Sequence, residues 1–259
     1  MAPKPRPPVP NPYSVDYSPT DRAICKGCDG RIAADSVRFL RKVWSPWHDG
    51  FDQQKYHLRC GFKFTSHLSE VRGWQALRWE DVMKVVVKFG ETIDEKNPVV
   101  QKYKKRSSCV WALVDLLKEL PKKQLLPILD ANEIFYNEVK ISALEAALII
   151  ADGILFGRFP PCPLCDTRAL LQEGCEIRCR GYMPNSSMRC SFRFILDDLL
   201  RPSRKPDNSA TGVDASSLER KELFILPPEA QRVPSLKGWK PPTDAPEVFK
   251  LGNPMSGQK

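Results

Sequence analysis

Two clusters of cysteine and histidine residues constrain the fold of this chain more than any other feature of its sequence. The first cluster consists of Cys25-Lys-Gly-Cys28, a gap of 28 residues, and His57-Leu-Arg-Cys60. Each close pair can hold one metal ion without backbone strain, and a closed set of three thiolates and one imidazole is typical of structural zinc. The four residues therefore predict a zinc ion. The long gap disfavours a ββα finger that reads the DNA major groove.

The second cluster consists of Cys162-Pro-Leu-Cys165, then Cys179 and Cys190. Four thiolates with one such close pair predict a zinc ribbon, in which strands carry the ligands. Cys175 lies in the same stretch and competes with Cys179 as the third ligand. Neither cluster combines an open coordination position with an obvious glutamate base, so we expect structural rather than hydrolytic metal chemistry. Two Zn²⁺ ions are the expected cofactors.

The N-terminal segment and the apolar stretches exclude two classes of protein. The start, MAPKPRPPVPNP, has no apolar run after its basic residues, unlike a secretory signal. Charges interrupt the apolar stretches well before the ~20 residues that a membrane span needs. We therefore expect neither a secreted nor a membrane protein, and the nine cysteines indicate metal binding rather than disulfides.

The net charge of +9 is concentrated near the N-terminus, where residues 1–90 carry 15 basic and nine acidic side chains. Such an excess favours a polyanionic partner for this part of the chain. The alternative is a basic protein whose charge only keeps it in solution.

Composition divides the chain into five parts. Residues 1–12, with six prolines, are expected to be a disordered arm, and residues 13–90 the first zinc domain. Near the end of that domain, Trp79, Val82, Met83, Val85 and Val86 have helical spacing before Gly90. Residues 91–106 are predicted to be a linker, 107–200 a second domain and 201–259 a mostly flexible tail with one contact near 222–229.

The second domain is predicted to be helical and then to become a zinc ribbon. We expect a helix capped by Ser107 or Ser108, then a shorter helix or a pair of turns kinked by Pro127, and a buried helix in ISALEAALIIADGILFG. The expected fold class is therefore that of small α+β domains stabilised by zinc.

Short motifs in both domains resemble one family. The segments YSVDY, RAICKGC, ADSVR, SPWHDG, YHLRC and LRWED are similar to the DNA-break-sensing finger of nuclear poly(ADP-ribose) polymerases, which is also found in a nick-sensing DNA ligase. Residues 107–228 resemble the next zinc domain of those polymerases, the PADR-type ribbon, through ADGILFGRFPPCPLC, the later cysteines and a closing ILPPE. Together these resemblances cover about four-fifths of the chain.

The resemblance implies recognition of DNA breaks by shape rather than by sequence. Such fingers hold phosphates with basic side chains and cover the exposed base stack with apolar ones. Matched motif by motif, Arg22 and Arg38 fall on the phosphate-contacting arginines of the family.

The loop before His57 is expected to hold the base-stacking residues. Alignment without gaps places the two family positions on His48 and Asp52, and an aspartate is unsuited to a site near phosphates. Trp47 and Phe51, one position earlier, are chemically better suited, and Trp44 is close by. Core packing is the alternative role for Trp44 and Trp47.

The chain departs from the family in two further ways. The family's second zinc domain carries a tryptophan that contacts the catalytic half, and nothing corresponds to it around Ser187 and Met188. We also find no nucleotide-binding glycine loop and no segment of catalytic size. The chain is therefore expected not to be an enzyme.

These features together predict a zinc-dependent nuclear protein that binds DNA strand breaks or ends in the DNA damage response. Its expected partners are broken DNA and an ADP-ribosyltransferase or other repair protein. Residues 104–106 and 201–205 are candidate import signals or solvated linker charges. One alternative is the sensor part of an NAD-dependent polymerase whose catalytic domain is encoded separately or missing. Another is a zinc-supported protein-interaction module, which the departure at Asp52 favours.

Overall fold

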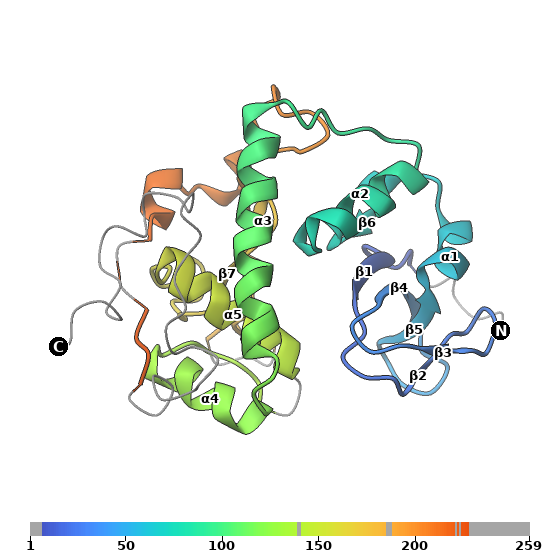
Figure 1. Cartoon of the computed structure of the whole chain (residues 1–259), viewed down its shortest axis with the longest axis horizontal. Helices are drawn as coiled ribbons and strands as arrows, with labels where there is room; N and C mark the ends of the chain where they lie inside the picture. The colour runs from blue at the N-terminus through green and yellow to red at the C-terminus, as the bar shows by residue number, and fades with distance from the viewer. Residues whose placement is uncertain (1–6, 139–140, 185–187, 221, 223, 228–259) are drawn as a thin grey trace. The chain divides into compact units, whose positions relative to one another are not determined.

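In a computed structural model, the structure describes residues 7–138, 141–184, 188–220, 222 and 224–227 (Figure 1). The chain forms two compact units, Met1–Ile93 and Asp94–Lys259. Each unit combines short strands with helices around its own buried side chains. The coarse expectation of small mixed α and β domains is therefore confirmed.

A four-stranded sheet with the order β5-β4-β1-β6 organises the first unit. Strand β4 pairs antiparallel with both neighbours, and β6 pairs parallel with β1. The β4–β5 hairpin places His57 opposite Arg38 at one end and Phe51 opposite Trp44 at the other. Its metal ligand and its aromatic tip are thus at opposite ends of one rigid element. The strands of this unit are β1 Tyr13–Tyr17, β2 Ala23–Ile24, β3 Arg31–Ile32, β4 Val37–Trp44, β5 Phe51–His57 and β6 Val71–Arg72.

Phe39 of β4 is fully buried at the centre of this unit. It lies against Gly61, the last residue of the short helix α1 (Leu58–Gly61), where an added Cβ would come within 2.2 Å of the phenyl ring. Glycine is therefore needed for this close approach of helix and strand. Three 3₁₀ helices follow, at Phe62–Phe64, Leu68–Glu70 and Trp74–Ala76.

Helix α2 (Trp79–Lys88) confirms the helix predicted from apolar spacing. It buries Trp79, Val82, Val85 and Val86 and ends before Gly90, which has a positive φ of 73°. The Tyr17 hydroxyl donates a 2.7 Å hydrogen bond to Asp81 in the first turn, which ties the helix to β1.

Helix α3 (Pro98–Leu117), the long green helix of Figure 1, begins earlier than the sequence predicts. The predicted cap at Ser107 or Ser108 is wrong, because Asn97 caps the helix by accepting a hydrogen bond from Val99 N–H, with Pro98 in the first turn. Residues 98–106 are consequently helical and not an extended linker. Arg106 is also turned inward against Asp152, which removes it from the candidate import signal.

Two further helices confirm the remaining helix predictions, and the second of them packs against both α3 and the first. Helix α4 (Lys122–Ala131) contains Pro127, and helix α5 (Ala143–Phe156) is buried on almost every side. The Ser142 hydroxyl caps α5 by accepting a hydrogen bond from the N–H of Glu145.

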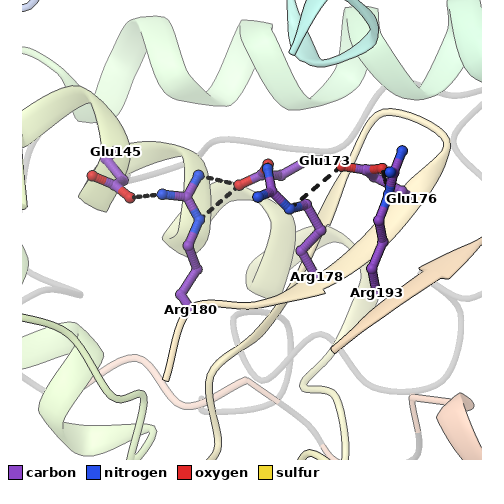
Figure 2. Close-up of polar contacts among 6 residues, drawn as sticks. All are labelled: Glu145, Glu173, Glu176, Arg178, Arg180 and Arg193. Carbon is purple, nitrogen blue, oxygen red and sulfur yellow. Dashed lines mark hydrogen bonds and ion pairs between the residues drawn. The ribbon is translucent and has the colours of Figure 1, made fainter. Parts of the chain in front are cut away.

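The ribbon is an antiparallel three-stranded sheet of β7 (Leu170–Glu173), β8 (Glu176–Cys179) and β9 (Arg193–Ile195). Its apolar side chains form one buried cluster with four cysteines. A chain of ion pairs runs across these strands to α5 (Figure 2). The members alternate in charge in the order Glu145, Arg180, Glu173, Arg178, Glu176 and Arg193.

The beginning of the predicted flexible tail is packed against the second unit. The Asn208 side chain accepts from Ile195 N–H and donates to Ile195 C=O, which extends the edge of β9. Phe224 is buried against Gly153 of α5, where a Cβ would come within 2.1 Å of its ring. Residues 201–220 are thus not a mostly flexible tail, because Asn208 completes the sheet edge and Leu218 is buried in the ribbon, whereas Phe224 lies within the contact predicted near 222–229. Residues 228–259 lie outside the described part of the chain.

The proline-rich arm is also partly in contact with the first unit. The Pro7 carbonyl accepts a hydrogen bond from the Trp44 indole, and the Pro12 carbonyl accepts one from Lys42 N–H. Residues 7–12 therefore lie along β4, whereas residues 1–6 of the predicted arm are outside the described residues. In the part of the chain that the structure describes, none of the helices has the length and apolar character to span a bilayer.

Candidate zinc centres and nucleic-acid interface

The first cluster brings Cys25, Cys28, His57 and Cys60 together. Cys25 and Cys28 lie in the turn between β2 and β3, His57 ends β5, and Cys60 is in α1. Their ligand atoms all lie within 4.8 Å of one another. The Cys28 Sγ to His57 Nδ1 distance is 3.3 Å. The arrangement therefore brings the β2–β3 turn, the end of β5 and α1 together at one point.

Hydrogen bonds around this cluster prepare it for a cation. Burial would raise the pKa of Cys25, but the backbone N–H groups of His57 and Gly27 each lie 3.3 Å from its Sγ, and the pKa is lowered to about 6. The Nε2 atom of His57 lies 2.9 Å from the Arg31 carbonyl. This contact fixes Nε2 as the protonated nitrogen and leaves Nδ1 for a metal.

The second cluster brings Cys162, Cys165, Cys179 and Cys190 within the same 4.8 Å limit, with all four buried. The Sγ atoms of Cys162 and Cys190 are 3.8 Å apart, and those of Cys165 and Cys179 are 3.5 Å apart. Zinc–sulfur bonds of ~2.3 Å in a tetrahedral site place sulfur atoms about 3.8 Å apart, so the spacing fits zinc.

The competition between Cys175 and Cys179 has a structural answer. Cys179 ends β8 beside the close cysteine pair, whereas Cys175 lies at the other end of that strand, near Tyr103 and Asp197. Burial raises the pKa of Cys175 well above its usual range, and the nearby Asp197 raises it further. Cys175 is therefore a buried neutral thiol and not part of the cluster.

Both donor sets fit structural zinc ions. Three thiolates with one imidazole, and four thiolates, are the sets that hold Zn²⁺ in closed tetrahedral sites. When bound, the metal would cross-link the turn, the hairpin and α1 in the first unit, and the strands in the second. The expectation of two zinc ions is thus consistent with two separate four-residue clusters.

The predicted stacking residues occupy the loop at the tip of the β4–β5 hairpin. The Trp47 side chain is 89% exposed and Phe51 is 38% exposed. Trp44 packs against Phe51 with ring centroids 4.4 Å apart, and the loop is closed by a hydrogen bond from Ser45 N–H to the Gly50 carbonyl. Core packing is therefore excluded for Trp47.

The two residues that alignment without gaps selects are paired with each other. His48 Nε2 lies 3.2 Å from the Asp52 carboxylate, and both side chains are exposed to solvent. The loop thus presents Trp47 and His48 outward, with Asp52 held by His48.

The two predicted phosphate contacts differ in accessibility. Arg22 is exposed on the turn before β2. The Arg38 side chain is only 10% exposed and donates from Nε and Nη2 to both carboxylate oxygens of Asp16, at 2.6 and 3.0 Å. The pairing across β1 and β4 explains this geometry, since Asp16 lies opposite Arg38 in register. The motif alone did not reveal Asp16 as a partner.

Comparisons with known proteins agree with the motifs. The chain is 24% identical over 288 aligned residues to poly(ADP-ribose) polymerase 1 of Danio rerio, an alignment that covers 95% of this chain and 25% of that protein. It is similar to poly(ADP-ribose) polymerases. A 90-residue alignment with the enzyme of Gallus gallus reaches 37% identity over 33% of this chain and 9% of the relative. The enzyme of Arabidopsis thaliana is 24% identical over 76% of this chain and 24% of its own length.

These matches confirm the resemblance read from the motifs. No family model matches the chain. The chain spans about a quarter or less of the length of the poly(ADP-ribose) polymerases that it matches.

Proposed function

We propose that this chain is a zinc-dependent, sequence-independent DNA-binding module that recognises strand breaks or ends. The first unit, a PARP-type finger, docks on the DNA, and the second, a PADR-type ribbon, adds affinity or presents a surface to a repair protein or an ADP-ribosyltransferase. The module acts in the nucleus, in the DNA damage response, and itself carries out no catalysis.

The observation that carries this proposal is the exposure of Trp47 at the tip of a rigid hairpin. Trp47 and Phe51 are both exposed at this end of the hairpin, and exposed apolar surface gathered in one place marks an interaction site. A strand break exposes the face of a base pair, and stacking of a base on an aromatic ring contributes about 1–3 kcal/mol. Trp47 and the half-exposed Phe51 offer such a surface, whereas an intact duplex offers them no open base face.

Basic side chains supply the part of the affinity that does not depend on sequence. Arg22 is exposed on the turn before β2, from which it can approach a phosphate. Arg38 keeps Nη1 outside its two hydrogen bonds to Asp16, so it would orient this surface more than it would neutralise phosphate charge. We therefore assign the larger phosphate contribution to Arg22.

Binding of the zinc-loaded protein to three DNA duplexes of equal length tests this proposal. One duplex is nicked, one is blunt-ended, and one is closed by hairpins at both ends, with binding followed by fluorescence anisotropy at two salt concentrations. We expect tighter binding to the nicked or blunt duplex, and Trp47→Ala should weaken it by roughly 5- to 150-fold. Phe135→Ala, which removes a 41%-exposed ring from the second unit, is the matched control.

The result also separates the alternatives. Equal binding to all three duplexes would contradict break recognition, and no binding to any would favour a zinc-supported protein-interaction module. Arg22→Ala should weaken binding to every duplex and reduce the steepness of the logarithmic salt dependence by about 0.9. If the chain is the sensor of a separately encoded polymerase, it should in addition stimulate a catalytic fragment when broken DNA is present.

A further inference from the structure

We propose that a second surface of the first unit binds a single-stranded nucleic-acid segment, such as the tail that extends from a processed break. The surface is an open groove between α1 and its following turn on one side and the end of α2 on the other. We call it the phenylalanine groove. It is lined by Arg59, Phe62, Lys63, Phe64, Thr65, Ser66, Lys88, Phe89 and Gly90.

The charge of the phenylalanine groove points to a polyanion. Arg59, Lys63 and Lys88 line it, all three are exposed, and none of the described lining residues is acidic. One carboxylate lies at the rim, where Glu70 accepts a hydrogen bond from Thr65. The groove thus concentrates three positive charges on one concave face, and such a face attracts phosphate chains from a distance.

The aromatic floor of the groove favours single-stranded nucleic acid over other polyanions. Phe62, Phe64 and Phe89 are each only partly buried. Phe62 and Phe89 meet edge to face with centroids 5.1 Å apart, so their rings present faces at different angles. A groove that combines cations along its sides with aromatic faces is the arrangement by which proteins bind unpaired bases without reading sequence. The bases of a duplex are stacked inside it and could not reach these faces.

Two lysines currently cover the ring faces. Lys63 Nζ lies 5.4 Å from the centroid of Phe64, and Lys88 Nζ lies 5.9 Å from that of Phe62. Exposed cation–π contacts of this length are weak, so the ammonium groups can swing to phosphates and free the rings for bases. Arg41 approaches Phe64 at 4.6 Å, which holds that ring in place.

This surface is distinct from the break-binding loop. Trp47 lies in the loop that precedes β5, whereas α1 and the phenylalanine groove follow the other end of that strand. The proposal extends the proposed function, since a tail beside a break would reach the groove, but single-strand binding can be measured without any break.

The test compares the full zinc-loaded chain with Lys63→Gln/Lys88→Gln in binding to labelled oligo(dT), to a blunt duplex and to the same duplex with a single-stranded tail. We expect the variant to bind oligo(dT) roughly tenfold more weakly, with a logarithmic salt dependence shallower by about 1.4. The tailed duplex should lose its advantage over the blunt one. Lys84→Gln/Lys123→Gln, which removes the same charge from exposed positions outside the groove, should bind as the wild type does.

Three outcomes would overturn the proposal. They are wild-type oligo(dT) binding by the groove variant, an equal loss in the control variant, and competition by poly-glutamate as strong as that by oligo(dT) at equal charge. Thermal melting of both variants checks that the fold is unchanged. Failure of the blunt duplex to bind would count against the Trp47 surface alone, because oligo(dT) needs no break.

Discussion

The two zinc centres differ in how deeply the protein encloses them. In the first, Cys25 is buried, His57 and Cys60 are half-buried and Cys28 is exposed. In the second, all four cysteines are buried and belong to the apolar cluster of the ribbon. The first unit has a separate core around Phe39, so its metal would stabilise a domain that has apolar packing of its own. In the ribbon the four cysteines lie inside the same buried cluster as the apolar side chains, so its metal would be part of that core.

This difference predicts that the second site contributes more to folding than the first. Structural zinc contributes on the order of 10–16 kcal/mol of apparent binding energy in small domains that fold only with metal. A domain with its own core keeps part of its structure without the metal, whereas a ribbon whose ligands fill its centre does not.

The largest effect is expected from Cys179→Ser. Loss of this ligand should release one zinc per chain and unfold the ribbon, because a buried tetrahedral site cannot be completed from solvent. Zinc content should fall from two ions to one, and the protein should become sensitive to limited proteolysis within residues 160–200.

Cys175→Ser is the matched control, since this thiol is equally buried but lies outside the cluster. It should keep two zinc ions and lose about 1 kcal/mol of stability at most from the polar substitution. Loss of zinc from Cys175→Ser, with two ions retained in Cys179→Ser, would reverse the ligand assignment.

The two sites should also differ in the rate at which they release zinc to a chelator. The first zinc should leave on the order of tenfold faster than the second, because Cys28 is exposed and the shell around a site controls solvent access. The measurement follows zinc with a metal-sensitive dye after addition of excess chelator.

Single-site variants assign the two phases of this release. Cys28→Ser should lack the fast phase and Cys179→Ser the slow one. A single phase in the wild type, or the reverse assignment, would show that burial does not set the order.

A smaller effect is expected where the chain closes over α5. Gly153→Ala should destabilise the second unit by about 1–3 kcal/mol, because the new methyl group would overlap Phe224, which outweighs the gain in helix propensity. Urea unfolding measures the change. Phe224→Ala is also destabilising alone, but combined with Gly153→Ala it should cost less than the sum of the two changes. Additive costs would mean that Phe224 does not pack against Gly153.

The sequence identified the residues that gather into the two clusters but told less about their surroundings. Close cysteine pairs can be recognised by their spacing, but Cys175 directly precedes β8, Cys179 ends it, and both are buried. Four residues of strand separate them by about 13 Å, so only the register of β8 decides which thiol reaches the cluster.

Long-range contacts explain most of the other features that the sequence did not predict. Asn97-Pro98 is a readable helix start, but the charged composition around it favoured a linker. The packing of Asn208 and Phe224 depends on Ile195 and Gly153, which are distant in sequence, so a polar tail gave no local signal. The exposure of Trp47 likewise depends on the hairpin that carries it. From the sequence alone, a tryptophan in a small domain could equally be packed in the core.

The smallest effect concerns the ion pairs between the ribbon and α5 (Figure 2). Glu145 of α5 meets Arg180 of the ribbon at 2.5 Å, and Arg180 also contacts Glu173. Glu145→Gln should lower the free energy of unfolding of the second unit by about 0.5–1 kcal/mol. The cost is small because these side chains remain partly solvated and the other ion pairs of the row are kept. Asp115→Asn, which breaks an exposed pair with Lys118 on α3, should cost less. Urea unfolding at low and high salt measures both, and the Glu145 effect should shrink at 1 M salt, since the pair is screened. A cost that is unchanged by salt would mean that Glu145 acts through packing and the first turn of α5 rather than through its ion pair with Arg180.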